Sequence, residues 1–174
     1  MTTANYIEYY VIPEDLGMDV YKVDLGLERF TSILKVMSTR EDLKFFQKSY
    51  KEYNYGEIIY QNYDNTETRV FRKVPMSSVY ENHVLKVAYQ RQKLSIINVP
   101  SNTAYKEIYT VNHLIFRITN RIFLNMLVKR SSSAANHVSY SVYVNYNHDD
   151  AVDCSQTEGK ITEILDLILA VPTY

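Results

Sequence analysis

The sequence predicts an α+β domain, with a mainly antiparallel sheet of about six or seven strands, two N-terminal helices and one C-terminal helix. Three observations favour this class. Apolar residues recur at helical spacing near both ends of the chain, the segments between them alternate apolar and polar residues, and these segments have short connections. The chain has 174 residues, the length of one domain. We therefore expect a single domain over residues 1–174, with 1–12 as an extended arm or an edge strand.

Two segments near the N-terminus have apolar residues at the spacing of amphipathic helices. The first covers residues 24–37, and the second covers residues 38–56 and ends at a glycine. The apolar face of the first consists of Leu27, Phe30, Leu34 and Met37. The apolar face of the second consists of Leu43, Phe46, Tyr50 and Tyr53. We expect both segments to be helices that precede the sheet.

The middle of the chain is typical of strands. The segments with alternating or β-branched residues are 56–63, 66–74, 83–90, 93–99, 107–118, 121–130 and 138–146. A last helix is expected over 155–171, with one apolar stripe on the face that would pack on the sheet. This stripe consists of Ile161, Ile164, Leu165 and Ile168.

Tyrosine dominates the aromatic composition, with 17 Tyr and no Trp. The tyrosines cluster with Asn more than with Lys or Arg, and Tyr is enriched at protein interfaces. In the expected strand 138–146, Tyr143 falls on the more polar of the two faces. We predict a contact with another chain through Tyr140, Tyr143 and Tyr146. The alternatives are that a helix of the same chain covers Tyr143 and that many tyrosines only fill strand positions, which they prefer.

Charge is distributed unevenly along the chain. Residues 69–130 hold 11 basic and 2 acidic side chains, between two acidic flanks. Such a region can bind nucleic acid or an acidic partner. Alternatively, the acidic helices cover the basic sheet. The candidate contact residues are Arg69, Arg72, Lys73, Arg91, Lys93, Arg117, Arg121, Lys129 and Arg130.

Motifs for familiar chemistry are absent from the sequence. The stretch His148–Cys154 is rich in Asp, but its spacing matches neither a calcium loop nor a zinc finger, and it is better suited to begin a helix. The four glycines are never clustered, which excludes a glycine-rich phosphate loop. Cys154 and a histidine could form a nucleophilic pair, but no nucleophile turn surrounds the cysteine. We therefore expect no catalytic residue, no metal and no cofactor.

An antiparallel set of strands can also form the barrel of a tunnel enzyme. Tunnel enzymes that cleave triphosphates inside an antiparallel barrel use an alternating Glu-x-Glu-x-Lys strand to hold the metal. This alternation is missing here, and the candidate strands carry Tyr, Val and Asn instead. The sequence therefore argues against this chemistry.

The Tyr- and Asn-rich strands at 58–71 and 121–150 resemble small structural proteins of large double-stranded DNA viruses. This resemblance implies a minor capsid protein or another virion component, located in the virion or the host cytoplasm, with other protein chains as partners. Outside a virus we expect an intracellular location, since the N-terminus lacks a secretory signal and no apolar run could span a membrane. We expect a non-enzymatic structural or interaction protein. A nucleic-acid-binding accessory protein is the alternative, and a small hydrolase is the third possibility.

Overall fold

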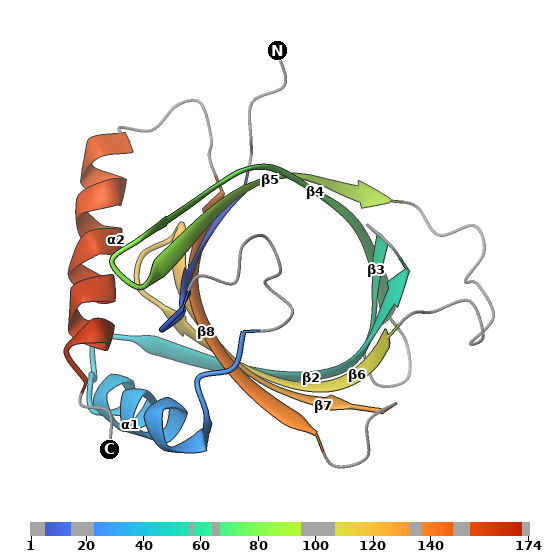
Figure 1. The fold of residues 1–174 in the computed structure, drawn as a ribbon, viewed down its shortest axis with the longest axis horizontal. Helices are drawn as coiled ribbons and strands as arrows, with labels where there is room; N and C mark the ends of the chain where they lie inside the picture. Colours follow the sequence, from blue (N-terminus) through green and yellow to red (C-terminus); the bar gives the residue numbers. More distant parts are fainter. Residues whose placement is uncertain are drawn as a thin grey trace.

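Eight antiparallel strands close into a barrel, and two helices pack on its outer wall (Figure 1). The computed structural model describes residues 6–14, 23–55, 58–63, 67–94, 107–132, 137–147 and 154–171. The elements in chain order are β1 (Tyr6–Val11), α1 (Leu27–Ser38), β2 (Lys44–Tyr55), β3 (Ile58–Tyr63), β4 (Glu67–Glu81), β5 (Val84–Leu94), β6 (Glu107–Arg117), β7 (Ile122–Ser131), β8 (Val138–Asn147) and α2 (Cys154–Leu169). Neither described helix has the length and apolar character that crossing a membrane requires.

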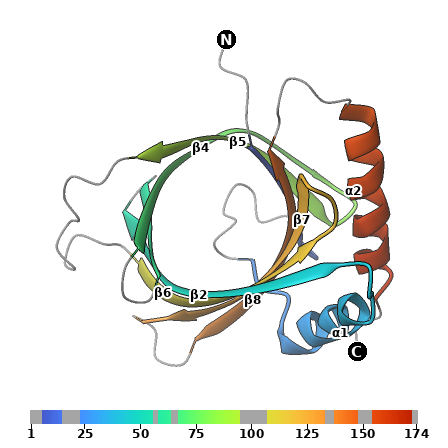
Figure 2. The same ribbon diagram turned by 180° about the vertical axis from the view of Figure 1, so that it is seen from behind.

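The barrel closes through its first strand. The order around the wall is β1-β5-β4-β3-β2-β6-β7-β8, and β1 also pairs with β8, from Tyr6 opposite Asn147 to Tyr10 opposite Tyr143. The view down the barrel from behind shows this ring without interruption (Figure 2). The predicted α+β class is therefore wrong. Residues 6–11, expected as an arm or edge strand, bridge two distant strands and turn an open sheet into a barrel.

The second expected N-terminal helix is a strand. Residues 44–55 form β2, which pairs with β6 along eleven residues and with β3 on its other side. The helical spacing of Phe46 and Tyr50 is compatible with a strand as well, because four residues is also an even number and leaves both side chains on one face. The many Phe and Tyr residues of this segment favour a strand, and the two ladders decide the outcome.

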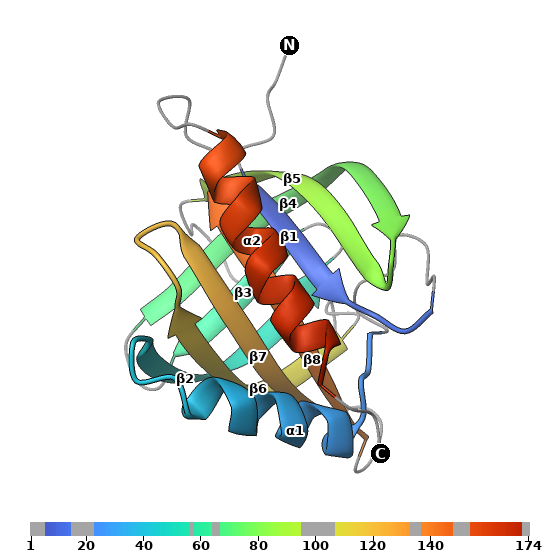
Figure 3. The same ribbon diagram turned by 90° about the vertical axis from the view of Figure 1, so that its left-hand side faces the viewer.

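The main hydrophobic core lies outside the barrel, between its wall and the helices. Both helices lie against the wall on the side of β1, β7 and β8 (Figure 3). The predicted stripe of α2 is confirmed, since Ile161, Ile164, Leu165 and Ile168 are all buried in this core. The predicted face of α1 is partly wrong: Phe30 and Met37 are buried, but Leu27 is 58% exposed.

Strand alternation therefore separates two environments. In β1, Ile7, Tyr9 and Val11 belong to the helix-covered core. Tyr6 and Tyr10, four residues apart on the other face, line the interior of the barrel. Because the helices bury the apolar outer face, the inner face is left to tyrosines and polar residues.

Candidate functional site in the barrel lumen

The interior of the barrel contains a cavity of about 580 Å³, lined by side chains from all eight strands. Cavities of roughly 300–1,000 Å³ are typical of sites for small molecules. The lining combines tyrosines with cationic and amide side chains, and it includes Tyr6, Tyr10, Tyr50, Tyr63, Tyr89, Tyr143, Lys48, Arg69, Lys73, Lys129, His113 and Asn125. We call this cavity the lumen.

One wall of the lumen holds the buried carboxylate of Glu8, which accepts four hydrogen bonds. Glu8 is 0% exposed, and the hydroxyls of Tyr6 and Tyr10 each donate to one of its oxygens at 2.8 Å. The Lys73 ammonium donates to both oxygens, at 3.0 and 3.2 Å. The ammonium also lies 4.8 Å from the ring centre of Tyr89. Both oxygens of Glu8 therefore accept hydrogen bonds from groups of its own chain.

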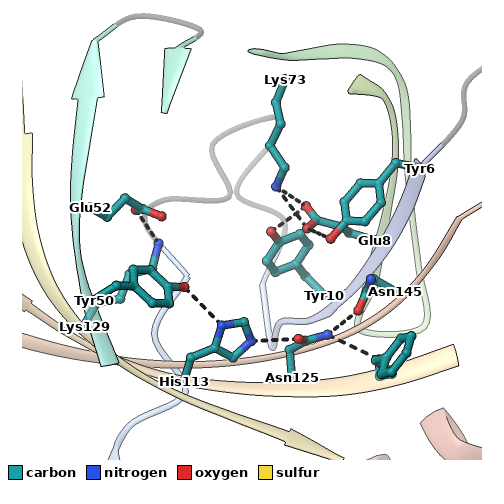
Figure 4. A network of polar contacts seen from close by, with 11 residues as sticks. Tyr6, Glu8, Tyr10, Tyr50, Glu52, Lys73, His113, Asn125, Lys129 and Asn145 are labelled. Atoms are coloured by element: carbon teal, nitrogen blue, oxygen red, sulfur yellow. Dashed lines mark hydrogen bonds and ion pairs between the residues drawn. The ribbon is translucent and has the colours of Figure 1, made fainter. Parts of the chain in front are cut away.

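A second ion pair lies on the other side of the lumen (Figure 4). The Lys129 ammonium on β7 donates to Glu52 Oε2 on β2 at 3.1 Å. Both glutamate side chains are nearly inaccessible, whereas Lys73 and Lys129 remain 19% and 18% exposed. Lys73 and Lys129 both line the cavity, as does Glu52, whereas Glu8 is fully buried.

The two glutamates stand on opposite walls. In the ring of eight strands, β1 and β2 are four places apart in either direction. Each lysine reaches its glutamate across one intervening strand, β5 for Lys73 and β6 for Lys129. Adjacent strands lie about 4.8 Å apart, so a span of two strands requires a side chain as long as lysine.

A neutral hydrogen-bond chain runs along the barrel wall across the adjacent strands β2, β6, β7 and β8 (Figure 4). Asn125 Nδ2 donates to Asn145 Oδ1, which leaves Asn125 Oδ1 to accept from His113 Nε2 at 2.7 Å. His113 Nδ1 then accepts from the Tyr50 hydroxyl at 3.1 Å. Burial lowers the pKa of His113 to about 4, which keeps the imidazole neutral, and its two hydrogen bonds select the tautomer with the proton on Nε2. Burial also raises the pKa of Tyr50, so its hydroxyl keeps its proton.

The lumen has an excess of positive charge among its described side chains. Lys48, Arg69, Lys73 and Lys129 line it, against the carboxylates of Glu8 and Glu52. Arg69 stacks on Tyr63, with the guanidinium carbon 4.9 Å from the ring centre. Cations inside a polar, partly enclosed cavity attract an anionic ligand more strongly than they would on the surface.

The described residues do not suit a divalent metal of the kind that tunnel enzymes hold with alternating glutamates. Magnesium and manganese prefer several free carboxylate oxygens. No two acidic residues of the sequence stand two positions apart, so no single strand can present a pair on one face. Within the described ranges, no three His, Cys, Asp or Glu side chains gather in a cluster. No step is therefore assigned to a metal here.

The predicted basic residues are divided between the lumen and the exterior. Arg69, Lys73 and Lys129 line the lumen. Arg72, Arg121 and Arg130 are exposed, and Arg117 is partly exposed and hydrogen-bonds Asn120. The side chains of Arg91 and Lys93 lie outside the described residues, although their backbone belongs to β5. The region is thus not one open basic face, and nucleic-acid binding by its outer residues stays a prediction.

The predicted interface tyrosines all make contacts within the chain. Tyr143 points into the lumen, with its ring centre 5.0 Å from that of Tyr10. Tyr140 packs on Phe30 of α1, and Tyr146 is buried in the core beside the helices. Their contact with another chain stays a prediction. The stretch 148–153 lies outside the described residues, as does the side chain of Cys154.

Sequence reasoning missed Glu8, Glu52 and Lys48, and it considered His113 only as one of the histidines that could pair with Cys154. A usable signal existed for Glu8, because a single acid flanked by tyrosines within an apolar strand must find a partner when the strand is buried. For Glu52 and Lys48 the signal was obscured by the expectation of a helix. His113 carried none, since its neutral state follows from burial and from contacts between strands.

Comparison with solved structures identifies the fold. The RNA triphosphatase Pct1 of S. pombe superposes with a TM-score of 0.72 over 97% of this chain and 85% of its own, at 7% sequence identity. The mimivirus capping enzyme triphosphatase superposes with a TM-score of 0.65 over 97% of this chain and 91% of its own, also at 7% identity. No family model matches the sequence, and no curated protein matches it.

These neighbours correct the functional expectation. The prediction of a non-enzymatic structural or minor capsid protein is contradicted, because the solved proteins that share the fold are triphosphatases. The resemblance to viral structural proteins is not tested by them. The missing Glu-x-Glu-x-Lys strand had argued against a tunnel enzyme, yet the barrel forms without it. The chain therefore has the fold of the RNA triphosphatases that it matches.

Proposed function

We propose that this protein is a hydrolase that cleaves a phosphoanhydride of a triphosphate-bearing ligand, such as the 5′-triphosphate end of RNA, in the barrel lumen. The observation that carries the proposal is a lumen lined by Lys48, Arg69, Lys73 and Lys129 in a fold shared with two RNA triphosphatases. A triphosphate is small enough for a cavity of about 580 Å³ and has the opposite charge.

The reaction is the attack of water on the terminal phosphorus. A bond forms between the water oxygen and phosphorus, and the bond from phosphorus to the bridging oxygen breaks. The products are inorganic phosphate and a diphosphate end, and the proton that the water loses passes to solvent. The transition state of phosphoryl transfer is loose, so positioning and neutralisation of charge on the phosphoryl oxygens supply most of the catalysis. Lys73 and Lys129, held from opposite walls, would provide this neutralisation. Tyr63 and Arg69 would bound the same space.

Phosphate release tests the proposal. The protein is incubated with an RNA oligonucleotide that carries a 5′-triphosphate, with the same oligonucleotide carrying a 5′-diphosphate, and with inorganic tripolyphosphate, each in EDTA and in Mg²⁺ or Mn²⁺. We expect one phosphate per triphosphate end and none from the diphosphate end. Absence of release from every substrate under every condition would contradict the proposal.

Paired variants assign the activity to the lumen. Glu52→Gln with Lys129→Met removes both charges of one ion pair, which avoids leaving a buried carboxylate unpaired. We expect this double variant to fold and to lose about tenfold or more in rate, or roughly 1.4 kcal/mol of transition-state stabilisation. Lys35→Met on the exposed face of α1 is the matched control, because it also removes one lysine but leaves the lumen intact.

A further inference from the structure

We infer that the lumen binds its polyanionic ligand directly through lysine ammonium groups and without a bridging divalent cation, and that Glu8 and Glu52 serve as counter-ions that hold these lysines in place. The inference rests on the proposed function for the nature of the ligand. It departs from the glutamate-held metal expected of tunnel enzymes.

Glu8 has no oxygen to offer a cation. Its two oxygens already accept from Tyr6, Tyr10 and twice from Lys73, and the side chain is completely buried. A metal ion at either oxygen would have to displace a tyrosine hydroxyl and would lie next to the Lys73 ammonium. The ammonium therefore occupies the position in which a metal would neutralise this carboxylate.

Glu52 cannot complete a metal site with Glu8. The two residues stand on strands that are four places apart in the ring, and Glu52 is bound to Lys129 at 3.1 Å. Among the described lining residues, the other strong transition-metal ligand is the imidazole of His113. Both nitrogens of His113 are engaged, by the Tyr50 hydroxyl and by the Asn125 amide oxygen. Within the part of the chain that the structure describes, one carboxylate on each wall and a fully bonded histidine make two separate ammonium sites and no shared metal site.

Lys73 and Lys129 place positive charge at the surface of the lumen. Each keeps about a fifth of its side chain exposed to the cavity while its glutamate is nearly or fully buried. Phosphate oxygens accept readily from ammonium groups, which act as point charges. Because each glutamate competes with the ligand for its lysine, removal of the carboxylate charge strengthens the attraction of that lysine for the ligand.

This competition gives a test, because binding through a metal and direct binding by lysine predict opposite changes in ligand affinity when Glu8 is replaced by Gln. If Glu8 held a metal that bridges to the ligand, Glu8→Gln would weaken binding. If Glu8 is only the counter-ion of Lys73, Glu8→Gln tightens binding, and Glu8→Gln with Lys73→Met weakens it relative to Glu8→Gln alone. Gln keeps the size of the side chain and can still bond the two tyrosine hydroxyls. Glu52→Gln on the opposite wall makes the same prediction independently, and it carries the test if Glu8→Gln does not fold.

The measurement is isothermal titration of the whole chain with inorganic tripolyphosphate, in excess EDTA and in excess Mg²⁺, with Lys35→Met as the control variant. We expect binding in EDTA that is no weaker than in Mg²⁺, several-fold tighter binding by Glu8→Gln or Glu52→Gln, and about tenfold weaker binding by the double variant than by Glu8→Gln. Binding that requires Mg²⁺, or weaker binding by both glutamine variants, would overturn the inference and leave the proposed function in place. No binding in either condition would overturn both.

Discussion

The Lys73 ammonium on β4 lies 3.0 Å from Glu8 Oε2 on β1, although β5 separates the two strands in the barrel wall. The same ammonium lies within 5.3 Å of the ring centres of Tyr6 and Tyr89. A long cationic side chain is thus held inside the lumen by one charged partner and two aromatic faces. This contact links the stability of the barrel to the charge that it presents to a ligand.

The Lys73–Glu8 pair predicts a non-additive effect on stability. Lys73→Met should lower the free energy of unfolding by roughly 3–5 kcal/mol, because it leaves a buried carboxylate uncompensated. Glu8→Gln with Lys73→Met should recover most of this loss, because no charge is then buried. Urea unfolding of the three proteins measures both values, and equal destabilisation of the single and double variants would contradict the pairing.

His113 predicts a pH dependence with a definite sign. Its ordinary pKa of 6.5 applies to the unfolded chain, and burial lowers the value to about 4 in the fold. Between these values the unfolded chain binds a proton that the folded chain does not, so stability is fully present above pH 6.5 and falls as the pH decreases toward 4. We expect His113→Asn to unfold with a shallower pH dependence in this window. Urea midpoints at several pH values measure it, and parallel curves for the two proteins would be the contrary result.

The stripe of α2 predicts large losses on truncation. Ile164 is 1% exposed and Leu165 is 8% exposed, both against the outer wall of the barrel. Ile164→Ala and Leu165→Ala should each cost roughly 2–5 kcal/mol, through lost burial and the cavity left behind. The exposed Asp166→Ala on the same helix is the control. If thermal unfolding were unchanged in both core variants, the helix would not stabilise the barrel.

We expect the loss of the Tyr143 ring to lower thermal stability more than the loss of its hydroxyl. Its ring packs at 5.0 Å from Tyr10 inside the lumen. Tyr143→Ala should lower the melting temperature by a few degrees, since it removes a ring pair worth roughly 0.5–1.5 kcal/mol as well as buried area. Tyr143→Phe should retain most of this stability. An unchanged melting temperature for Tyr143→Ala, together with a lower oligomeric state in gel filtration, would instead support the contact with another chain that the sequence suggests.

Several elements could be predicted from the sequence because their patterns are local. The strands β6, β7 and β8 follow from alternation along each segment, and α1 and α2 follow from apolar residues at helical spacing. In the candidate site, Arg69, Lys73 and Lys129 belonged to the predicted basic set. The sequence does not show that these three side chains point into a lumen. The same alternation of residues occurs in an open sheet and in a closed barrel.

The alternation of residues along each strand can be read from the sequence, and it requires Tyr143 and Val144 to face opposite ways. Which of these faces becomes an interior depends on how the strands pair and close into a barrel. Residues 44–55 became a strand because β3 and β6 supply hydrogen bonds to both of its edges. The barrel closed because β1 pairs with β8 across more than 130 residues of chain. Pairings of this range depend on the whole fold, since the entropy lost in closing a long loop is recovered only when all strands are in register.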